Sequence, residues 1–485
     1  MCLRALLFLF HFKRAAMLAN YLKTALRNLL KRRLYTIVNI TGLAAGIACF
    51  MLLTLYLQNE WTYDQFHANA AQLFRIRMDY GEKDQEVIHT AMNPSALGPL
   101  LKDFPEVKDM SRVYPAATVV KYGDIVATEK RFIYADPAFF RMFSFPLLSG
   151  NVAAVLNGPG MVVLSASMAR KYFGTTDAAG KSLKINDKET YIVTGVAADP
   201  PANTHLKFDF VASYASLGHK DGWSAPNYYT YVQLKGKATA SGLHNRLRGF
   251  IKAQMADVTQ HGATIDFVPE AVPDIHLHSI AGNSTGAGGD IRYNYILAVV
   301  AVLLLLIACI NFMNLATARS ADRSREIGVR KALGAVRGQL FWQFIAESMF
   351  ITLAAMILGV LIAVLLLPSF NNMTGVSLSL GFKNGYRIYA LLGIVFLGTT
   401  FLAGTYPALF LSGFRPVKVL KGKLPYAAGG ALRRSLVVFQ FAVSVFFISC
   451  TLVVSRQLRS IQHKKLGMDR CGVLLLSGSR FNMQT

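Results

Sequence analysis

One stretch of the sequence has the residue types of a phosphate-binding loop. Gly174 and Gly180 flank five residues and are followed by Lys181 and Ser182. A P-loop has one residue fewer between its glycines, so that successive backbone N–H groups wrap the phosphates, and its lysine opens a helix. Here the lysine leads into a strand-like SLKIN segment. We therefore interpret this stretch as a turn.

The rest of the chain does not indicate catalysis. It has no nucleophile elbow, no HExxH and no nucleotide-binding glycine series. The cysteines show neither CxxC nor Cys/His spacing, so no metal site is predicted; they are Cys2, Cys49, Cys309, Cys450 and Cys471. We expect a non-enzymatic chain that itself binds no cofactor and no metal.

The strongest motif is one that could act by contact, in the sequence RSREIGVRKALGA. Its candidate residues are Arg325, Glu326, Ile327, Gly328, Arg330, Lys331, Ala332, Leu333 and Gly334. Glu326 and Arg330 have the spacing of an ion pair on a helix, and Ile327, Ala332 and Leu333 offer apolar surface for docking. The alternative is a solvated charge run, which explains the bases but not the compact apolar set among them.

Five long apolar runs must position this motif. They are the segments 35–57, 296–315, 348–367, 388–411 and 436–454, and none contains a charged residue. Each approaches or exceeds the roughly 20 residues that cross a bilayer as a helix. With 53% hydrophobic residues and a mean hydropathy of +0.36, the 485-residue chain is too apolar for a soluble protein.

The net charge of +24 is confined to short segments. Residues 58–293 are neutral, with 23 basic and 23 acidic side chains. Basic residues number eight against no acids in 1–34, six against two in 318–339, and six against none in 412–435. Short basic loops stay on the cytoplasmic side, so this pattern predicts a membrane topology and not a nucleic-acid surface.

These patterns predict an α-helical membrane protein of about five spans, with a large α+β extracytoplasmic domain between spans one and two. We expect an amphipathic helix on the inner leaflet at 1–34, in contact with anionic lipid, although this segment could also continue the first span into the cytosol. The remaining predicted parts are the first span (35–57), the outer domain (58–293), spans two to four (294–411, with the motif loop at 318–339), a cytoplasmic linker (412–435), and a fifth span that starts a second repeat (436–485).

That apparent repeat predicts that the chain is a fragment of a duplicated protein, and translation could start at Met1 or at Met17. In the outer domain, alternation predicts strands at 74–78, 161–164, 191–196, 228–234 and 264–268. Helical patterns cover 94–104, 165–173 and 241–255, after a helical stem that begins near Glu60. Two subdomains are compatible with this length.

The motif RSREIGVRKALGA, with the QLFWQFIAES that follows, resembles the loop between the second and third spans of FtsX/MacB-like ABC transporter permeases. Further similar stretches are Val163-Leu-Ser, Asp199-Pro-Pro and Phe414-Arg-Pro-Val. The resemblance implies a MacB-like periplasmic core domain and a permease subunit that works with a separate ABC ATPase, which binds the ATP. Residues 325–335 would dock on that ATPase and pass its motion outward (mechanotransmission). MacB itself carries a fused ATPase, and in this respect the chain is more similar to double-repeat permeases of four plus four spans.

The resemblance implies a multi-pass protein of the bacterial inner membrane, with a cytoplasmic N-terminus and a periplasmic large domain. It implies export or lipoprotein or peptide trafficking, or alternatively an FtsX-like regulator of an external cell-wall hydrolase. A sensor without an ATPase is a third hypothesis, which the docking motif disfavours. Expected partners are the ATPase, lipid, a second permease copy or paired permease, and a periplasmic adaptor, lipoprotein or hydrolase.

Overall fold

The computed structural model describes residues 33–82, 85–187, 189–218, 220–254, 263–285, 288–318, 327–380, 386–412 and 430–463. Most of the helix predicted at 1–34, most of the linker predicted at 412–435, and the predicted second repeat beyond residue 463 lie outside the described residues. The chain divides into two compact units, which are described separately. The first is Met1–Ile47, Leu304–Val360 and Tyr386–Thr485, and the second is Ala48–Leu303 and Leu361–Gly385.

The predicted apolar runs all lie in long helices. These are α2 (Arg33–Trp61), α9 (Ile291–Ala318), α11 (Arg337–Thr374), α12 (Tyr386–Ser412) and α14 (Gly430–His463). Among the described residues, α2, α9, α11 and α14 are long and apolar enough to cross a membrane, and α12 has a shorter apolar stretch, Tyr389–Thr405. The helices extend beyond the apolar runs, because polar residues outside the hydrocarbon layer can continue a helix.

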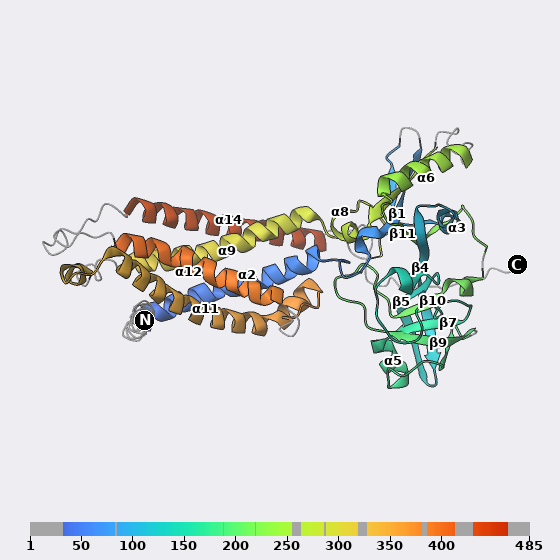
Figure 1. The fold of residues 1–485 in the computed structure, drawn as a ribbon, viewed down its shortest axis with the longest axis horizontal. Coiled ribbons are helices and arrows are strands. Elements are labelled where there is room, and N and C mark those ends of the chain that lie inside the picture. The colour runs from blue at the N-terminus through green and yellow to red at the C-terminus, as the bar shows by residue number, and fades with distance from the viewer. Residues whose placement is uncertain are drawn as a thin grey trace, which may run out of the picture. The chain divides into compact units, whose positions relative to one another are not determined.

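Small residues bring the long helices of the first unit together. A Cβ atom added at Gly46 of α2 would lie 2.5 Å from the Ala308 Cβ of α9. One added at Gly359 of α11 would lie 3.0 Å from the Ala44 carbonyl oxygen of α2. Such close approach lets helices gain dispersion contacts where lipid removes the hydrophobic driving force. Helix α2 therefore packs against both α9 and α11 (Figure 1).

The described strands of the second unit form one 12-stranded sheet, with the main order β12-β1-β11-β4-β5-β10-β7-β9-β6. The strands are β1 (Leu73–Glu82), β2 (Ile88–Thr90), β3 (Asn93–Pro94), β4 (Val107–Tyr122), β5 (Ile125–Ala135), β6 (Leu147–Ser149), β7 (Met161–Ser165), β8 (Ser182–Ile185), β9 (Glu189–Ala197), β10 (Phe210–Ser213), β11 (Pro226–Leu234) and β12 (Ala263–Ala271). The short helices are α3 (Leu97–Lys102), α4 (Phe139–Met142), α5 (Ala166–Phe173), α6 (Ala240–Gln254) and α8 (Ile275–His278), with 3-10 turns η1 (Ala70–Gln72), η2 (Tyr214–Leu217) and η3 (Val272–Asp274).

Separate hydrophobic cores lie along this sheet. Helices α3 and α6 cover the end that holds β1, β11 and β12, and α5 covers the end that holds β7 and β9 (Figure 1). Strand β4 contributes Val107 and Met110 to the first of these cores and Val120 to the second. The two cores thus share one long strand, which joins them in a single sheet.

The structure confirms the strands predicted at β1, β7, β9, β11 and β12 and the helices predicted at α5 and α6. The predicted helical stem was too long, because α2 ends at Trp61 and turns follow. The helix predicted at 94–104 is reduced to α3, since Pro94 pairs with β11 as part of β3. The hairpin of β4 and β5 was missed, although its Gly-Asp turn, with Gly123 at φ +55, gives a local signal.

Replacing Gly46 by alanine should weaken the packing of α2 on α9. The new methyl group would overlap the Ala308 side chain at 2.5 Å, and overpacking of this kind destabilises by about 1–3 kcal/mol. The thermal unfolding midpoint of the purified chain in detergent should therefore fall. Gly393→Ala in α12 is the matched control, because its Cβ meets nothing within 4 Å. Equal losses in the two variants would contradict the packing argument.

Candidate functional site

The glycine and lysine stretch after α5 is a turn, as predicted. Gly174 adopts φ +72 and caps α5, with its N–H bonded to the Arg170 carbonyl at 2.9 Å. Gly180 adopts φ +84, and Lys181 precedes strand β8, which pairs antiparallel with β9. The lysine therefore does not open a helix, and the stretch lacks the geometry of a phosphate-binding loop.

Within the described residues the contact motif is helical over 327–332, which is called the short helix below, and this helix ends in a glycine cap. Gly334 adopts φ +93, the Ala335 N–H donates to the Arg330 carbonyl at 3.0 Å, and the Gly334 N–H donates to the Lys331 carbonyl at 3.1 Å. This pair of bonds is a Schellman motif, which needs a left-handed residue and so favours glycine. The cap stops the helix and turns the chain toward α11.

The inner side of this short helix is anchored. Ile327 is only 3% exposed and belongs to a buried cluster from α11 and α12. The other buried members of that cluster are Leu340, Phe344, Ile345 and Ala408. The Arg330 Nη1 donates to Gln343 Oε1 of α11 at 2.8 Å. The short helix is therefore held on two of the long helices.

The outer side of the short helix carries exposed apolar and basic groups. Leu333 is 82% exposed, Val329 is about half exposed, and Ala332 is also exposed. Burial and the positive charge of Arg337 lower the pKa of Lys331 below its ordinary value. A surface hollow of about 350 Å³ adjoins these groups, and its lining is Arg330, Leu333, Gly334, Ala335, Gln339, Leu340 and Gln343.

The predicted docking residues therefore separate into four groups. Arg325 and Glu326 lie outside the described residues, and so does the predicted pair of Glu326 with Arg330. Ile327 and Gly328 are buried, and Arg330 and Lys331 are partly exposed. Ala332, Leu333 and Gly334 are exposed. Of the apolar set proposed from the sequence, Ile327 is an anchor, and Ala332 and Leu333 form accessible surface.

Two family models match separate parts of the chain. The MacB-like periplasmic core domain matches residues 36–250, and the FtsX-like permease C-terminal domain matches residues 298–416, which include the contact motif. The chain belongs to the FtsX/MacB-like ABC transporter permease family. Its fold, an α-helical membrane protein with an α+β domain, agrees with that membership.

Relatives of this permease differ in how much of their own length it matches. A macrolide export ATP-binding/permease protein MacB of Bdellovibrio bacteriovorus is 28% identical over 54% of this chain and 38% of its own length. An uncharacterised ABC transporter permease YknZ of Bacillus subtilis is 23% identical over 71% of this chain and 85% of its own. In three of the MacB relatives, the match covers 38%, 19% and 60% of the relative's own length.

A solved domain of a permease from Porphyromonas gingivalis also matches this permease. It has 19% sequence identity and a TM-score of 0.38, and covers 42% of this chain and 91% of that domain.

A polar contact joins the last turn of α2 to the segment before α9 in this permease. The Glu60 Oε2 lies 2.9 Å from His276 Nε2, and the Tyr63 ring stacks on His276 with centroids 3.6 Å apart. The Gly289 N–H donates to the His276 carbonyl at 2.7 Å. A Cβ at Gly289 would lie 3.2 Å from both Glu60 Oε2 and His276 Nε2, so glycine permits this tight junction.

A second junction follows α2 at Asp64, which is fully buried with φ +55. Its carboxylate accepts hydrogen bonds from the Thr204 hydroxyl at 2.5 Å and from His205 Nδ1 at 2.7 Å. The His205 Nε2 lies 2.9 Å from the Tyr231 hydroxyl on β11. Burial alone would raise the pKa of Asp64, but the charge of His205 and the hydrogen bonds of its neighbours lower it overall.

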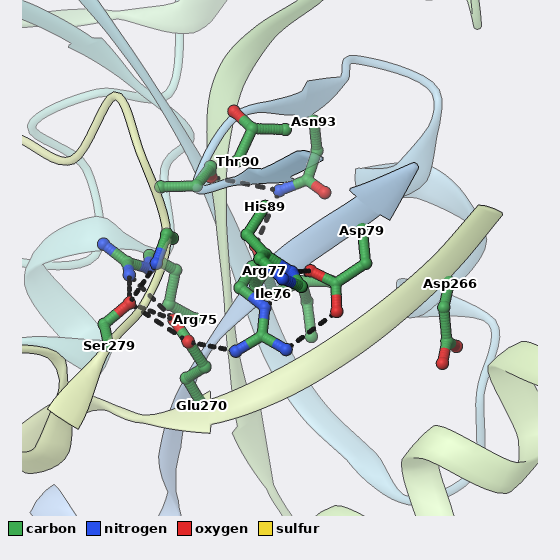
Figure 2. A network of polar contacts seen from close by, with 12 residues as sticks. Arg75, Ile76, Arg77, Asp79, His89, Thr90, Asn93, Asp266, Glu270 and Ser279 are labelled. Carbon is green, nitrogen blue, oxygen red and sulfur yellow. Dashed lines mark hydrogen bonds and ion pairs between the residues drawn. The ribbon is translucent and has the colours of Figure 1, made fainter. Parts of the chain in front are cut away.

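A third junction centres on Arg75 of β1, which is fully buried (Figure 2). Its guanidinium donates to Glu270 of β12 at 2.7 Å, to Ser279 at 2.9 Å and to Ser284 at 2.9 Å. Arg77 donates to the other oxygen of Glu270 at 2.8 Å. One glutamate thus accepts from two arginines, and Arg75 holds the segment that leads toward α9.

No local sequence pattern singled out these junction residues. A signal was present in β1, because Arg75 and Arg77 stand two apart in a strand and must share a face. Two like charges on one face require an acid nearby, and Glu270 supplies it from β12. Its position opposite Arg75 follows from strand register, which local sequence does not specify.

Acid should weaken the α+β unit through Asp64. Its folded pKa lies below its unfolded value of about 3.9, so its contribution is present above about pH 4 and is lost as the pH falls toward the folded value. The urea midpoint of the chain, followed by near-UV circular dichroism, should stay level near pH 6 and fall below about pH 4. Asparagine tolerates the left-handed backbone at this position, so the Asp64→Asn variant should fold and its urea midpoint should fall less at low pH. An identical acid dependence in the variant would disprove the assignment.

Replacing Arg75 by methionine should strongly destabilise the α+β unit. Breaking a buried ion pair costs about 3–5 kcal/mol, and because Arg77 still pairs with Glu270 the loss should lie at the lower end of that range. Lys121→Gln is the control, since its pair with Asp187 is exposed and 3.7 Å long and should contribute less than about 1 kcal/mol. Urea denaturation of both variants measures the difference, and similar midpoints would refute it.

Proposed function

We propose that this chain is the non-catalytic permease subunit of an ABC-type complex, in which a separate ATPase docks on residues 325–334. ATP binds to that partner, and its motion passes through the long helices to the α+β unit. The observation that carries this proposal is the two-sided helix at 327–332, with Ile327 buried against α11 and α12 and Leu333 82% exposed.

A helix with one buried face and one exposed face is suited to pass on a push from a partner protein. A partner that pushes on Leu333 would move a helix fixed by Ile327 and by the bond from Arg330 to Gln343, so the displacement reaches α11. The exposed leucine beside basic groups favours a partner surface with an apolar pocket and an acidic rim. The positive environment of Lys331 supports that charge complementarity.

The junction residues support the last step of the proposed transmission, from the long helices to the α+β unit. Helix α2 is covalently continuous from Arg33 to Trp61, and its last turn bonds through Glu60 to His276. Arg75 and Glu270 hold the segment after α8 on strands β1 and β12. A shift of α2 or α9 would therefore be delivered to the sheet, because their ends are fixed by directional bonds.

The proposed setting is a bacterial inner membrane, with the N-terminus inside and the α+β unit in the periplasm. The basic segments at 318–339 and 412–435 support this orientation. We propose that the complex carries out export or lipoprotein or peptide trafficking. A second permease copy or a paired permease would complete the complex. The Bdellovibrio relative is named for macrolide export, which favours transport.

Leu333→Asp and Glu326→Lys should each reduce ATPase association at least about tenfold. The first places a charge in an apolar contact, and the second replaces an acid at i, i+4 spacing from Arg330 by a like charge that opposes the helix. Pull-down of the co-expressed ATPase by the tagged chain measures this effect. Leu333→Met is the matched control and should retain binding. Near-UV circular dichroism should show an unchanged outer unit in all three variants.

Retention of the ATPase by both charge variants would overturn the docking assignment.

Crosslinking from the outer side of the membrane tests which external partner the complex acts on. Recovery of an adaptor or lipoprotein supports export or trafficking, whereas recovery of a cell-wall hydrolase would replace it with the regulatory function.

A further inference from the structure

Two buried carboxylates stand four residues apart at the C-terminal end of α2. Glu60 is 7% exposed, and Asp64 is fully buried. Their ion-pair partners are histidines: His276 lies 2.9 Å from Glu60, His205 lies 2.7 Å from Asp64, and His67 lies farther from Asp64, at 3.8 Å. Among the described residues, no lysine or arginine lies within ion-pair distance of either carboxylate.

The other buried acids that the structure describes in the α+β unit have lysine or arginine as partners. Asp136 pairs with Arg112 at 2.9 Å, and Glu129 pairs with Lys171 at 2.6 Å. Lysine and arginine ordinarily keep their charge at physiological pH, whereas histidine gains and loses its proton between about pH 5 and 8. The charge balance around the two carboxylates of α2 therefore depends on pH.

The hydrogen bonds make His205, and not His67, the cation for Asp64. His205 Nδ1 faces the carboxylate, and its Nε2 lies 2.9 Å from the Tyr231 hydroxyl, which can donate to a neutral ring or accept from a charged one. His67 Nδ1 instead accepts the Ser144 N–H at 3.1 Å, so the proton of its neutral ring stands on Nε2. A second proton on His67 would oppose that N–H. His205 can thus change its charge without losing a hydrogen bond, and His67 cannot.

His276 is placed to act as the cation for Glu60. Its Nε2 faces the carboxylate, and its ring lies flat on the Tyr63 ring, with centroids 3.6 Å apart and an interplanar angle of 7°. Burial, and then the charges of Asp64 and Glu60, raise the pKa of Tyr63 to about 12. Tyr63 therefore stays neutral where histidine titrates. Tyr56 also faces Glu60.

The remaining ionisable groups that face these carboxylates and histidines are a tyrosine, a lysine and an arginine. Burial raises the pKa of Tyr231 above its ordinary value. The charge of Lys207 acts on Asp64, and the charge of Arg75 acts on Tyr231. Tyrosine, lysine and arginine ordinarily titrate at about pH 10 or above. The histidines are therefore the groups that change charge near neutral pH.

We propose that the C-terminal end of α2 is held by two pH-dependent ion pairs, Glu60 with His276 and Asp64 with His205. When both histidines are protonated, each buried carboxylate contacts a cation. When both are neutral, two buried charges lack a contacting cation, which is strongly unfavourable.

The sign of the pH dependence follows from these charges. The stabilisation is present below about pH 6.5, where unfolded histidine is protonated, and is lost as the pH rises and the folded histidines lose their protons. Resting on the proposed function, the two pairs regulate how a shift of α2 reaches the sheet. The attachment is firm near pH 6 and loosened near pH 9.

The double variant His205→Asn and His276→Gln tests the proposal in the chain alone in detergent. The asparagine amide can replace Nδ1, and the glutamine amide can replace Nε2, as uncharged donors to the carboxylates. The urea midpoint of the unchanged chain, followed by near-UV circular dichroism, should fall by at least about 0.5 M between pH 6 and pH 9. The double variant should start lower at pH 6 and fall less than about a third as much, and each single variant should lose about half of the fall.

His278→Gln is the matched control, because His278 is exposed and lies 3.8 Å from Asp274, and this variant should keep the full fall. A level midpoint in the unchanged chain, or an equal fall in the double variant, would overturn the proposal.

Hydrogen exchange of the backbone amides of residues 58–68 localises the effect. At pH 6 these amides should exchange at least about fivefold more slowly in the unchanged chain than in the double variant, and at pH 9 the two rates should agree within about twofold. Comparing the two chains at one pH removes the intrinsic pH dependence of exchange. A ratio that is the same at both pH values would overturn the proposed pairs. No ATPase is present in these measurements, so that result would leave the docking proposal intact.

Discussion

The hydrocarbon core of a membrane offers no hydrogen-bond partner to a polar group, and the helical unit depends on this constraint. Its backbone groups are satisfied within α2, α9, α11, α12 and α14, and most threonines there bond to their own helix. Association then rests on close contact, which explains glycines where helices cross. Against this background the buried side chains of Asn39, Thr352 and Thr400 are exceptions, because they have no hydrogen-bond partner among the described residues.

The α+β unit meets the same demand in another way. Buried charges such as Arg75 and Asp64 are retained with several directional partners each. Buried ion pairs often add little net stability, because desolvation offsets their attraction, but they fix geometry. Here they fix the segments next to α2 and α9 against the sheet. A family whose members connect a membrane domain to an outer domain would benefit from such rigid junctions.

The two faces of the helix at 327–332 have different surroundings. Its inner face is part of the core with Ile327, while its outer face leaves Leu333 in solvent. The glycine cap at Gly334 ends the helix before α11 begins, and Gln339 accepts the Val336 N–H at 3.3 Å to start it.

The sequence by itself determined the features that depend on local pattern. Apolar runs predicted the long helices, charge segregation predicted an orientation, and alternation predicted β1, β7, β9, β11 and β12, because each signal lies within one segment. Only the tertiary structure decided which residues face which partner. Ile327 is an anchor because Ala408, some eighty residues away, packs on it, and Arg75 meets Glu270 only through strand register. Such pairings are set by the packing of distant segments, and no local periodicity encodes them.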